Sequence, residues 1–148
     1  MATFRLEPVL RLRRHHEERR KCDLAAALAV ENGLKDTAMR YAGIRQAEAR
    51  RFREQQRAGV LDVRALVDQK VYIGLLDREI SEQLRSVAQA EHETTGRRRK
   101  LADAMVDRKA LDVLRDRALA AERAVQDRAE TAELDDVGGR MFTRQARA

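Results

Sequence analysis

The side chains best suited to metal binding form one small group near the N-terminus. His15 and Glu18 are three residues apart, which would place both on one face of a helix, and His16 lies beside them. A metal site would need further ligands from another segment. The segment that we expect to face this group is the run Gly-Arg-Arg-Arg-Lys at residues 96–100, which would repel a cation. We therefore expect no metal.

The sequence also lacks the patterns that support catalysis. It has no Gly-rich phosphate loop, no Ser/His/Asp ordering and no Cys/His cluster. Cys22 is the only cysteine, so an intrachain disulfide is impossible, and we interpret it as a small seam or surface residue in a reducing compartment. We predict a protein that is not an enzyme, with no catalytic residue and no cofactor.

The strongest pattern in the sequence is a heptad repeat. Because only 3% of the residues are aromatic and 38% are charged, a thick globular core is not expected. Apolar side chains instead recur every seventh position, with two further leucines at intermediate positions, and this predicts a long helix with one narrow seam. The residues are Leu66, Ile73, Ile80 and Val87, with Leu76 and Leu84.

Local signals divide the chain into two helices. Pro8 suits a first helical turn, Gly59 can end a helix in the left-handed conformation, and Asp62 can cap the next helix. The predicted fold is all-α: one long antiparallel two-helix coiled-coil hairpin over residues 1–148, with the second helix overhanging. We expect the elements to be helix 1 at about 7–58, a turn at 59–62, helix 2 at about 63–137, and a tail at 138–148 that follows the interruption by two glycines.

A hairpin centred near residue 60 brings together positions whose numbers sum to about 120, such as Tyr41 with Ile80. The helix 1 seam is then expected at Leu24, Ala27, Glu31, Leu34, Ala38, Tyr41, Arg45, Glu48 and Phe52. Beyond about Arg115, helix 2 has no predicted partner. Its remaining apolar stripe is either lean helix surface or a docking face, and consists of Ala118, Ala121 and Val125 with Leu134.

Positive charge is concentrated in two segments that the hairpin would place side by side. The chain has 31 basic and 25 acidic residues, a net charge of +6. Residues 11–23 carry six basic and three acidic side chains, and residues 97–109 carry six and two, so the two segments together carry +7. This belt is either solvated helix surface or a surface that meets an acidic protein collar or polyphosphate. Nucleic acid is a third interpretation, although the scarcity of aromatic residues argues against single-strand recognition.

The ends of the sequence resemble one known family. The run Phe4-Arg5-Leu6-Glu7-Pro8-Val9-Leu10-Arg11-Leu12-Arg13 resembles the opening of the flagellar type III export protein FliJ, which has a Phe-x-Leu-Glu-x-Val-Leu-x-Leu-Arg pattern. Residues 108–115 and 133–136 look like the family's second-helix motifs. The resemblance spans nearly the whole chain.

This resemblance implies a non-enzymatic stalk of the flagellar export apparatus, with paired helix ends that enter the hexameric export ATPase. Further implied partners are the membrane export-gate protein and export chaperones, with no nucleic acid. The residues that could meet the ATPase ring are Arg13, Arg14, Arg20, Arg97, Arg98, Arg99 and Lys100, and Tyr72 could contact the gate.

Location follows from the same reasoning. We see no signal peptide in the first residues and no apolar run of membrane-spanning length, so a cytoplasmic protein is expected. The resemblance further implies a position peripheral at the inner face of the cell membrane. Two alternatives stay open at this point: the equivalent stalk of a virulence injectisome, and a nucleic-acid-binding coiled coil.

Overall fold

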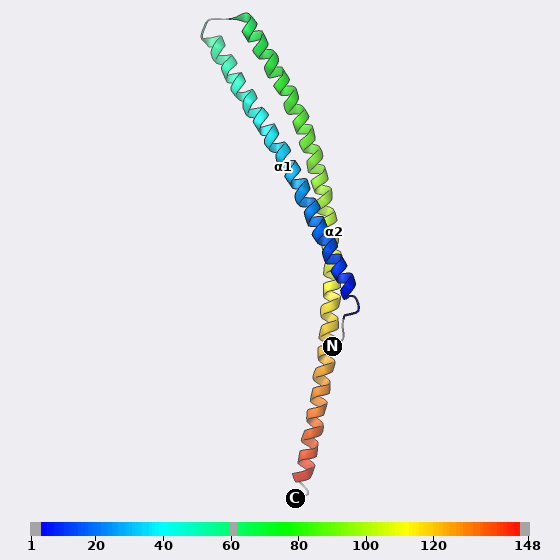
Figure 1. Cartoon of the computed structure of the whole chain (residues 1–148). Coiled ribbons are helices and arrows are strands. Elements are labelled where there is room, and N and C mark those ends of the chain that lie inside the picture. The colour runs from blue at the N-terminus through cyan, green and yellow to red at the C-terminus, as the bar shows by residue number, and fades with distance from the viewer. Residues whose placement is uncertain (1–3, 60–61, 146–148) are drawn as a thin grey trace. The chain divides into compact units, whose positions relative to one another are not determined.

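The computed structural model describes residues 4–59 and 62–145, with side chains at all of these except 139 and 141–145. Its secondary structure consists of two helices, α1 (Glu7–Arg57) and α2 (Val63–Gln145), which pack against each other (Figure 1). No strand occurs within the described residues. The predicted all-α helical hairpin is therefore confirmed.

The chain reverses direction through a short turn. Gly59 has a φ of 76°, the left-handed conformation that favours glycine at a helix C-terminus. Asp62 Oδ1 accepts hydrogen bonds from the backbone N–H groups of Arg64 (3.0 Å) and Ala65 (3.2 Å), so Asp62 is the N-cap of α2. Both local predictions are confirmed, whereas residues 60 and 61 of the expected turn lie outside the described residues.

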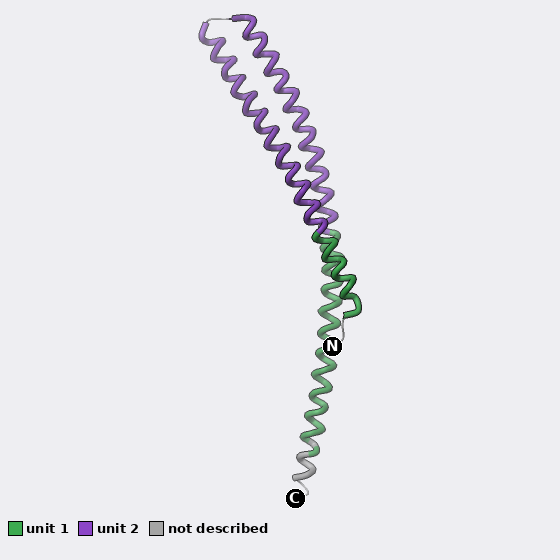
Figure 2. Tube along the Cα trace, in the orientation of Figure 1, with its two compact units in different colours: residues 1–18, 103–148 green, residues 19–102 purple. Residues whose placement is uncertain are grey.

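The two helices form two compact units, each containing a part of α1 and a part of α2 (Figure 2). We call residues 19–102, which include the turn, the turn unit. We call residues up to 18 together with residues from 103 onward the terminal unit. Each unit is described separately below.

In the turn unit, one seam joins antiparallel segments of α1 and α2. Every α1 position predicted for the seam, from Leu24 to Phe52, is buried or half-buried. Arg45 Nε donates to Asp77 Oδ1 at 2.9 Å, and these numbers sum to nearly 120 as expected. On α2 the buried and half-buried seam positions alternate by three and four residues and are Leu66, Gln69, Ile73, Leu76, Ile80, Gln83, Val87, Ala90, Thr94, Arg97 and Leu101.

One predicted seam residue is wrong. The side chain of Leu84 is 55% exposed, and Gln83 occupies the seam position instead. The spacing after Ile80 explains the difference, because the alternation of three and four places residue 83, not 84, on the buried face. Gln83 is accommodated there because its Nε2 donates to Glu79 Oε1 at 2.9 Å.

In the terminal unit, the seam continues with fewer apolar residues. Leu10 is fully buried, and Glu17 on α1 and Ala104 on α2 are also buried. Arg108, Leu111 and Arg115 on α2 are half-buried. The seam is therefore as much polar as apolar.

The predicted end of helix 2 at residue 137 is also wrong, because α2 continues through the two glycines to Gln145. Gly138 does not adopt a positive φ, so it imposes no helix stop. A glycine within a helix costs about 1 kcal/mol relative to alanine but creates no clash. Residues 146–148 of the predicted tail lie outside the described residues.

Candidate partner-binding surface

The residues predicted to meet partners are divided between the two units. Arg13 and Arg14 belong to the terminal unit, and the other six belong to the turn unit, namely Arg20, Tyr72, Arg97, Arg98, Arg99 and Lys100. The structure therefore presents two separate sets of side chains.

In the terminal unit, the predicted arginines are paired with acidic residues of α2. Arg13 Nη1 donates to Asp107 Oδ2 at 3.1 Å, and Arg14 Nη2 donates to Asp112 Oδ1 at 3.0 Å. Desolvation alone would raise the pKa of Asp112, but the hydrogen bonds from Arg14 and Arg108 outweigh it and lower the pKa. These arginines thus already hold α1 to α2, and their charges are largely balanced.

A further cross-helix pair lies in the terminal unit beside these residues. The buried carboxylate of Glu17 accepts a hydrogen bond from Arg108 Nε, and Arg108 Nη1 also donates to Asp112. The hydrogen bond to Glu17 is the main reason that the pKa of Arg108 is raised above its ordinary value. A buried carboxylate requires such a partner, because an uncompensated charge at the seam would be strongly unfavourable.

In the turn unit, Arg20 and Arg97 share one acidic partner. Asp23 Oδ2 lies 3.4 Å from Arg20 Nη1 and 3.7 Å from Arg97 Nη1. Arg97 Nη2 also donates to Glu93 Oε1 at 3.0 Å. The net charge predicted for the belt was a sum of formal charges. In the structure, many of these charges form ion pairs, either between α1 and α2 or along one helix.

Three predicted residues differ from the others. Arg98, Arg99 and Lys100 are exposed, and none of them forms an ion pair or a side-chain hydrogen bond with any described residue. They are consecutive on α2, so their charges point in different directions around the helix but share one short segment. The charge of Arg98 also helps to lower the pKa of Glu31, but no ion pair with a described residue balances the charges of this segment, which therefore offers exposed positive charge in the turn unit.

The sequence reasoning did not identify a second charged cluster in the turn unit. Lys35 Nζ lies 2.7 Å from Glu31 Oε1 and 2.8 Å from Glu91 Oε1, so this lysine links α1 to α2. The hydrogen bond from Lys35 is the largest cause that lowers the pKa of Glu31. The sequence did contain a signal for this cluster: Lys35 follows Glu31 by four residues on α1, and a glutamate at a seam position requires a partner for its charge.

Tyr72 lies on α2 in the turn unit and is partly exposed. Val71 and Leu75, close to it on the same helix, are exposed as well. Together they form an apolar surface on the outside of the helix pair. An exposed apolar group of this kind is suited to contact with another protein.

Two kinds of feature do not occur among the described residues. Among residues 4–59 and 62–145, no three His, Cys, Asp or Glu side chains are grouped closely enough to hold a metal ion. Nor does either helix, over the part that the structure describes, contain a stretch long and apolar enough to cross a membrane.

The geometry defines a class of protein: an all-α helical hairpin whose chemistry consists of ion pairs along a polar seam and exposed side chains on its surface. The comparison with known families agrees, since the family described as "Flagellar FliJ protein" matches residues 1–147. The chain belongs to the FliJ family. It is therefore a component of the flagellar export apparatus, in a family that is non-catalytic. Neither the curated proteins nor the solved structures include a significant match.

Proposed function

We propose that the chain is a stalk that couples the hexameric flagellar export ATPase to the membrane export-gate protein, and that it escorts export chaperones. Family membership over residues 1–147 supports the apparatus in which it acts. The observation that carries the proposed ATPase contact is the run of exposed cations Arg98, Arg99 and Lys100, none of which forms an ion pair with a described residue.

These cations are better suited to a partner than the paired arginines. Arg13, Arg14 and Arg97 would have to exchange existing ion pairs for new ones, which returns little free energy. Residues 98–100 form no such ion pair with any described residue, so binding a partner breaks none of these. Their long-range attraction to acidic groups on a ring would increase the association rate and orient the chain.

The experiment measures ATP turnover by the cognate export ATPase with and without the purified chain. We expect the chain to promote ring assembly or raise turnover, and the triple variant R98A/R99A/K100A to lose this effect. The matched control removes the same number of arginines and lysines from other exposed positions of the turn unit, as R50A/R51A/K70A. An equal loss in both variants would contradict the assignment of the contact, and no effect of the natural chain would contradict the coupling role.

The exposed apolar group around Tyr72 is proposed to contact the gate protein. Peripheral association with the inner face of the membrane would follow from that contact. We expect Tyr72→Ala to weaken binding to the purified cytoplasmic part of the gate protein, whereas truncation of Val106, which is also exposed on α2, should leave binding unchanged. Equal binding by the natural chain and the Tyr72 variant would remove Tyr72 from the contact.

A further inference from the structure

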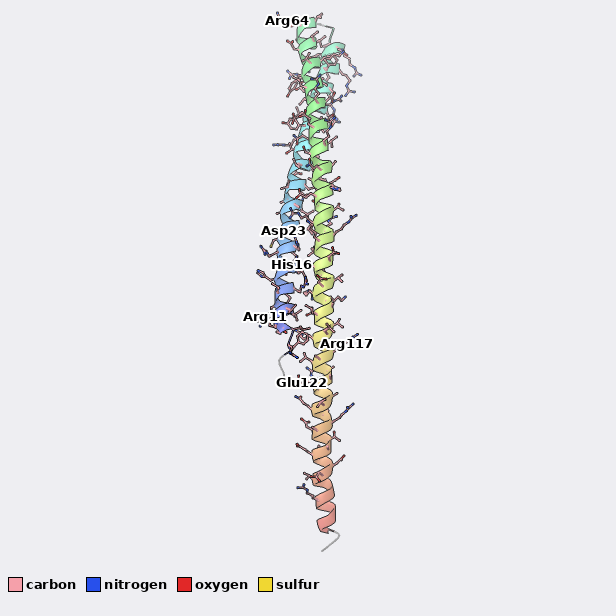
Figure 3. The ribbon with its side chains drawn as sticks, turned by 90° about the vertical axis from the view of Figure 1, so that its right-hand side faces the viewer. Arg11, His16, Asp23, Arg64, Arg117 and Glu122 are labelled. Atoms are coloured by element: carbon pink, nitrogen blue, oxygen red, sulfur yellow. The ribbon has the colours of Figure 1, made fainter. Side chains whose placement is uncertain are left out.

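In the terminal unit, α2 continues well beyond the part that α1 covers. Residues 116–138 of α2 are exposed, except for Glu122, which is half-buried. Figure 3 shows Arg117 and Glu122 on this part of the helix. The seam positions Ala104 and Leu111 are followed at seven-residue intervals by Ala118, Val125 and Ala132. An established helix interface therefore continues along a face that has no partner helix among the described residues.

The residues on this face are arranged symmetrically about Val125, whose side chain is 64% exposed. Ala121 and Ala129 lie four positions before and after it, and Ala118 and Ala132 lie seven positions before and after it. If a second copy of the helix packs in the opposite direction, Ala118 of one copy meets Ala132 of the other, Ala121 meets Ala129, and Val125 meets Val125. A two-fold symmetric contact requires this kind of self-complementary surface.

The outer charges beside this face match an antiparallel partner, whereas Glu122 and Arg128 would each share an edge with their own copies at about 9 Å along the axis, a weaker interaction. At 100° per residue, Arg117 and Asp135 lie on one edge of the face, and Arg115 and Glu133 lie on the other. In an antiparallel pair, Arg117 of one copy approaches Asp135 of the other, and Arg115 approaches Glu133. In a parallel pair, arginine would approach arginine and carboxylate would approach carboxylate, which is unfavourable.

We propose that two copies of the chain associate through this face of α2, residues 115–135, in an antiparallel pair with Val125 on the two-fold axis. The contact is short and its central side chains are small, so it buries less surface than a standard stable interface. The pair is therefore reversible and forms where the local concentration of the chain is high. The proposal is independent of the coupling role.

Disulfide cross-linking tests the direction of the pair in the full-length chain. The natural Cys22 is first replaced by serine, and Ala118→Cys and Ala132→Cys are then made separately. An antiparallel pair brings Cys at 118 of one copy next to Cys at 132 of the other, within disulfide distance. We expect mild oxidation to cross-link the mixture of the two variants about tenfold faster than either variant alone. Ala120→Cys mixed with Thr131→Cys is the control, because both positions lie on the opposite face of α2.

Several outcomes would overturn the proposal. Efficient cross-linking of either variant with itself would indicate a parallel pair, and equal rates in the test and control mixtures would indicate random collision. Sedimentation equilibrium gives an independent measurement. Arg117→Glu should raise the dissociation constant of the natural pair by about tenfold, and the double variant with Asp135→Arg should restore it. A chain that stays monomeric at millimolar concentration contradicts the proposal.

Discussion

Replacing Leu76 by alanine tests whether the seam stabilises the turn unit. Leu76 is 5% exposed, and Leu84, two helical turns further along α2, is 55% exposed. The substitution removes three carbon atoms, and at about 0.8 kcal/mol per buried carbon the transfer cost is about 2.4 kcal/mol. Large-to-small substitutions in cores cost roughly 2–5 kcal/mol. A two-helix seam lies at the low end of this range, because solvent can reach the vacated space from both sides.

The assay is urea unfolding followed by circular dichroism at 222 nm, with the free energy of unfolding taken from linear extrapolation. We expect Leu76→Ala to lower the free energy of unfolding by about 2–2.5 kcal/mol and the melting temperature by roughly 5–10 °C. Leu84→Ala is the matched control, and it should cost less than about 1 kcal/mol because its side chain is mostly exposed. Equal losses in the two variants, or a larger loss for Leu84→Ala, would refute the assigned seam.

Three further predictions concern the turn and the polar seam. Gly59→Ala should destabilise the chain by about 1–2 kcal/mol because residue 59 has a positive φ, whereas Gly74→Ala should stabilise it by about 1 kcal/mol because residue 74 is helical and has open space where a Cβ would lie. The melting temperatures of the two variants should therefore shift in opposite directions. Asp62→Ala removes the N-cap of α2 and should cost about 1 kcal/mol in urea unfolding, and recovery by Asp62→Ser but not by Asp62→Val would identify capping as the cause. The pKa of Glu31 is lowered from its ordinary 4.5 by its hydrogen bond with Lys35, so the ionised Glu31 stabilises the fold above the unfolded pKa, and this stabilisation is lost as the pH falls through the lower folded pKa. The free energy of unfolding should therefore fall less steeply between pH 5 and pH 3 in Glu31→Gln than in the natural chain, and parallel curves for the two proteins would contradict this role of Glu31.

Sequence rules predicted those parts of the fold that depend on few residues at a time. Gly59 and Asp62 act through their own backbone and the next turn of helix, so their roles could be read from residue type and position. The α1 seam could be predicted through its polar members Glu31, Arg45 and Glu48, because the three-and-four spacing continues regardless of residue type.

The errors in the seam and in the candidate site arose where a polar group finds a partner that residue type does not reveal. Leu84 was preferred to Gln83 on hydrophobicity, although Glu79 on the same helix satisfies the Gln83 amide. The candidate site shows the same effect. Arg13 and Arg14 counted as free positive charge until their pairs with Asp107 and Asp112 were known. Only the three-dimensional register shows which of the predicted cations, residues 98–100, form no ion pair within the part of the chain that the structure describes.

The three-and-four spacing of the seam restricts how the length of such a chain can change. One inserted residue inside α2 would rotate every later side chain by about 100° about the helix axis and move the following buried positions into water. Seven inserted residues return the later side chains to nearly their original direction, so additions within a helix are tolerated in whole heptads. Where α1 and α2 are paired, the other helix needs an addition of the same length. Single-residue additions are better tolerated in the turn between Arg57 and Val63, because an insertion there leaves the spacing of seam positions within each helix unchanged.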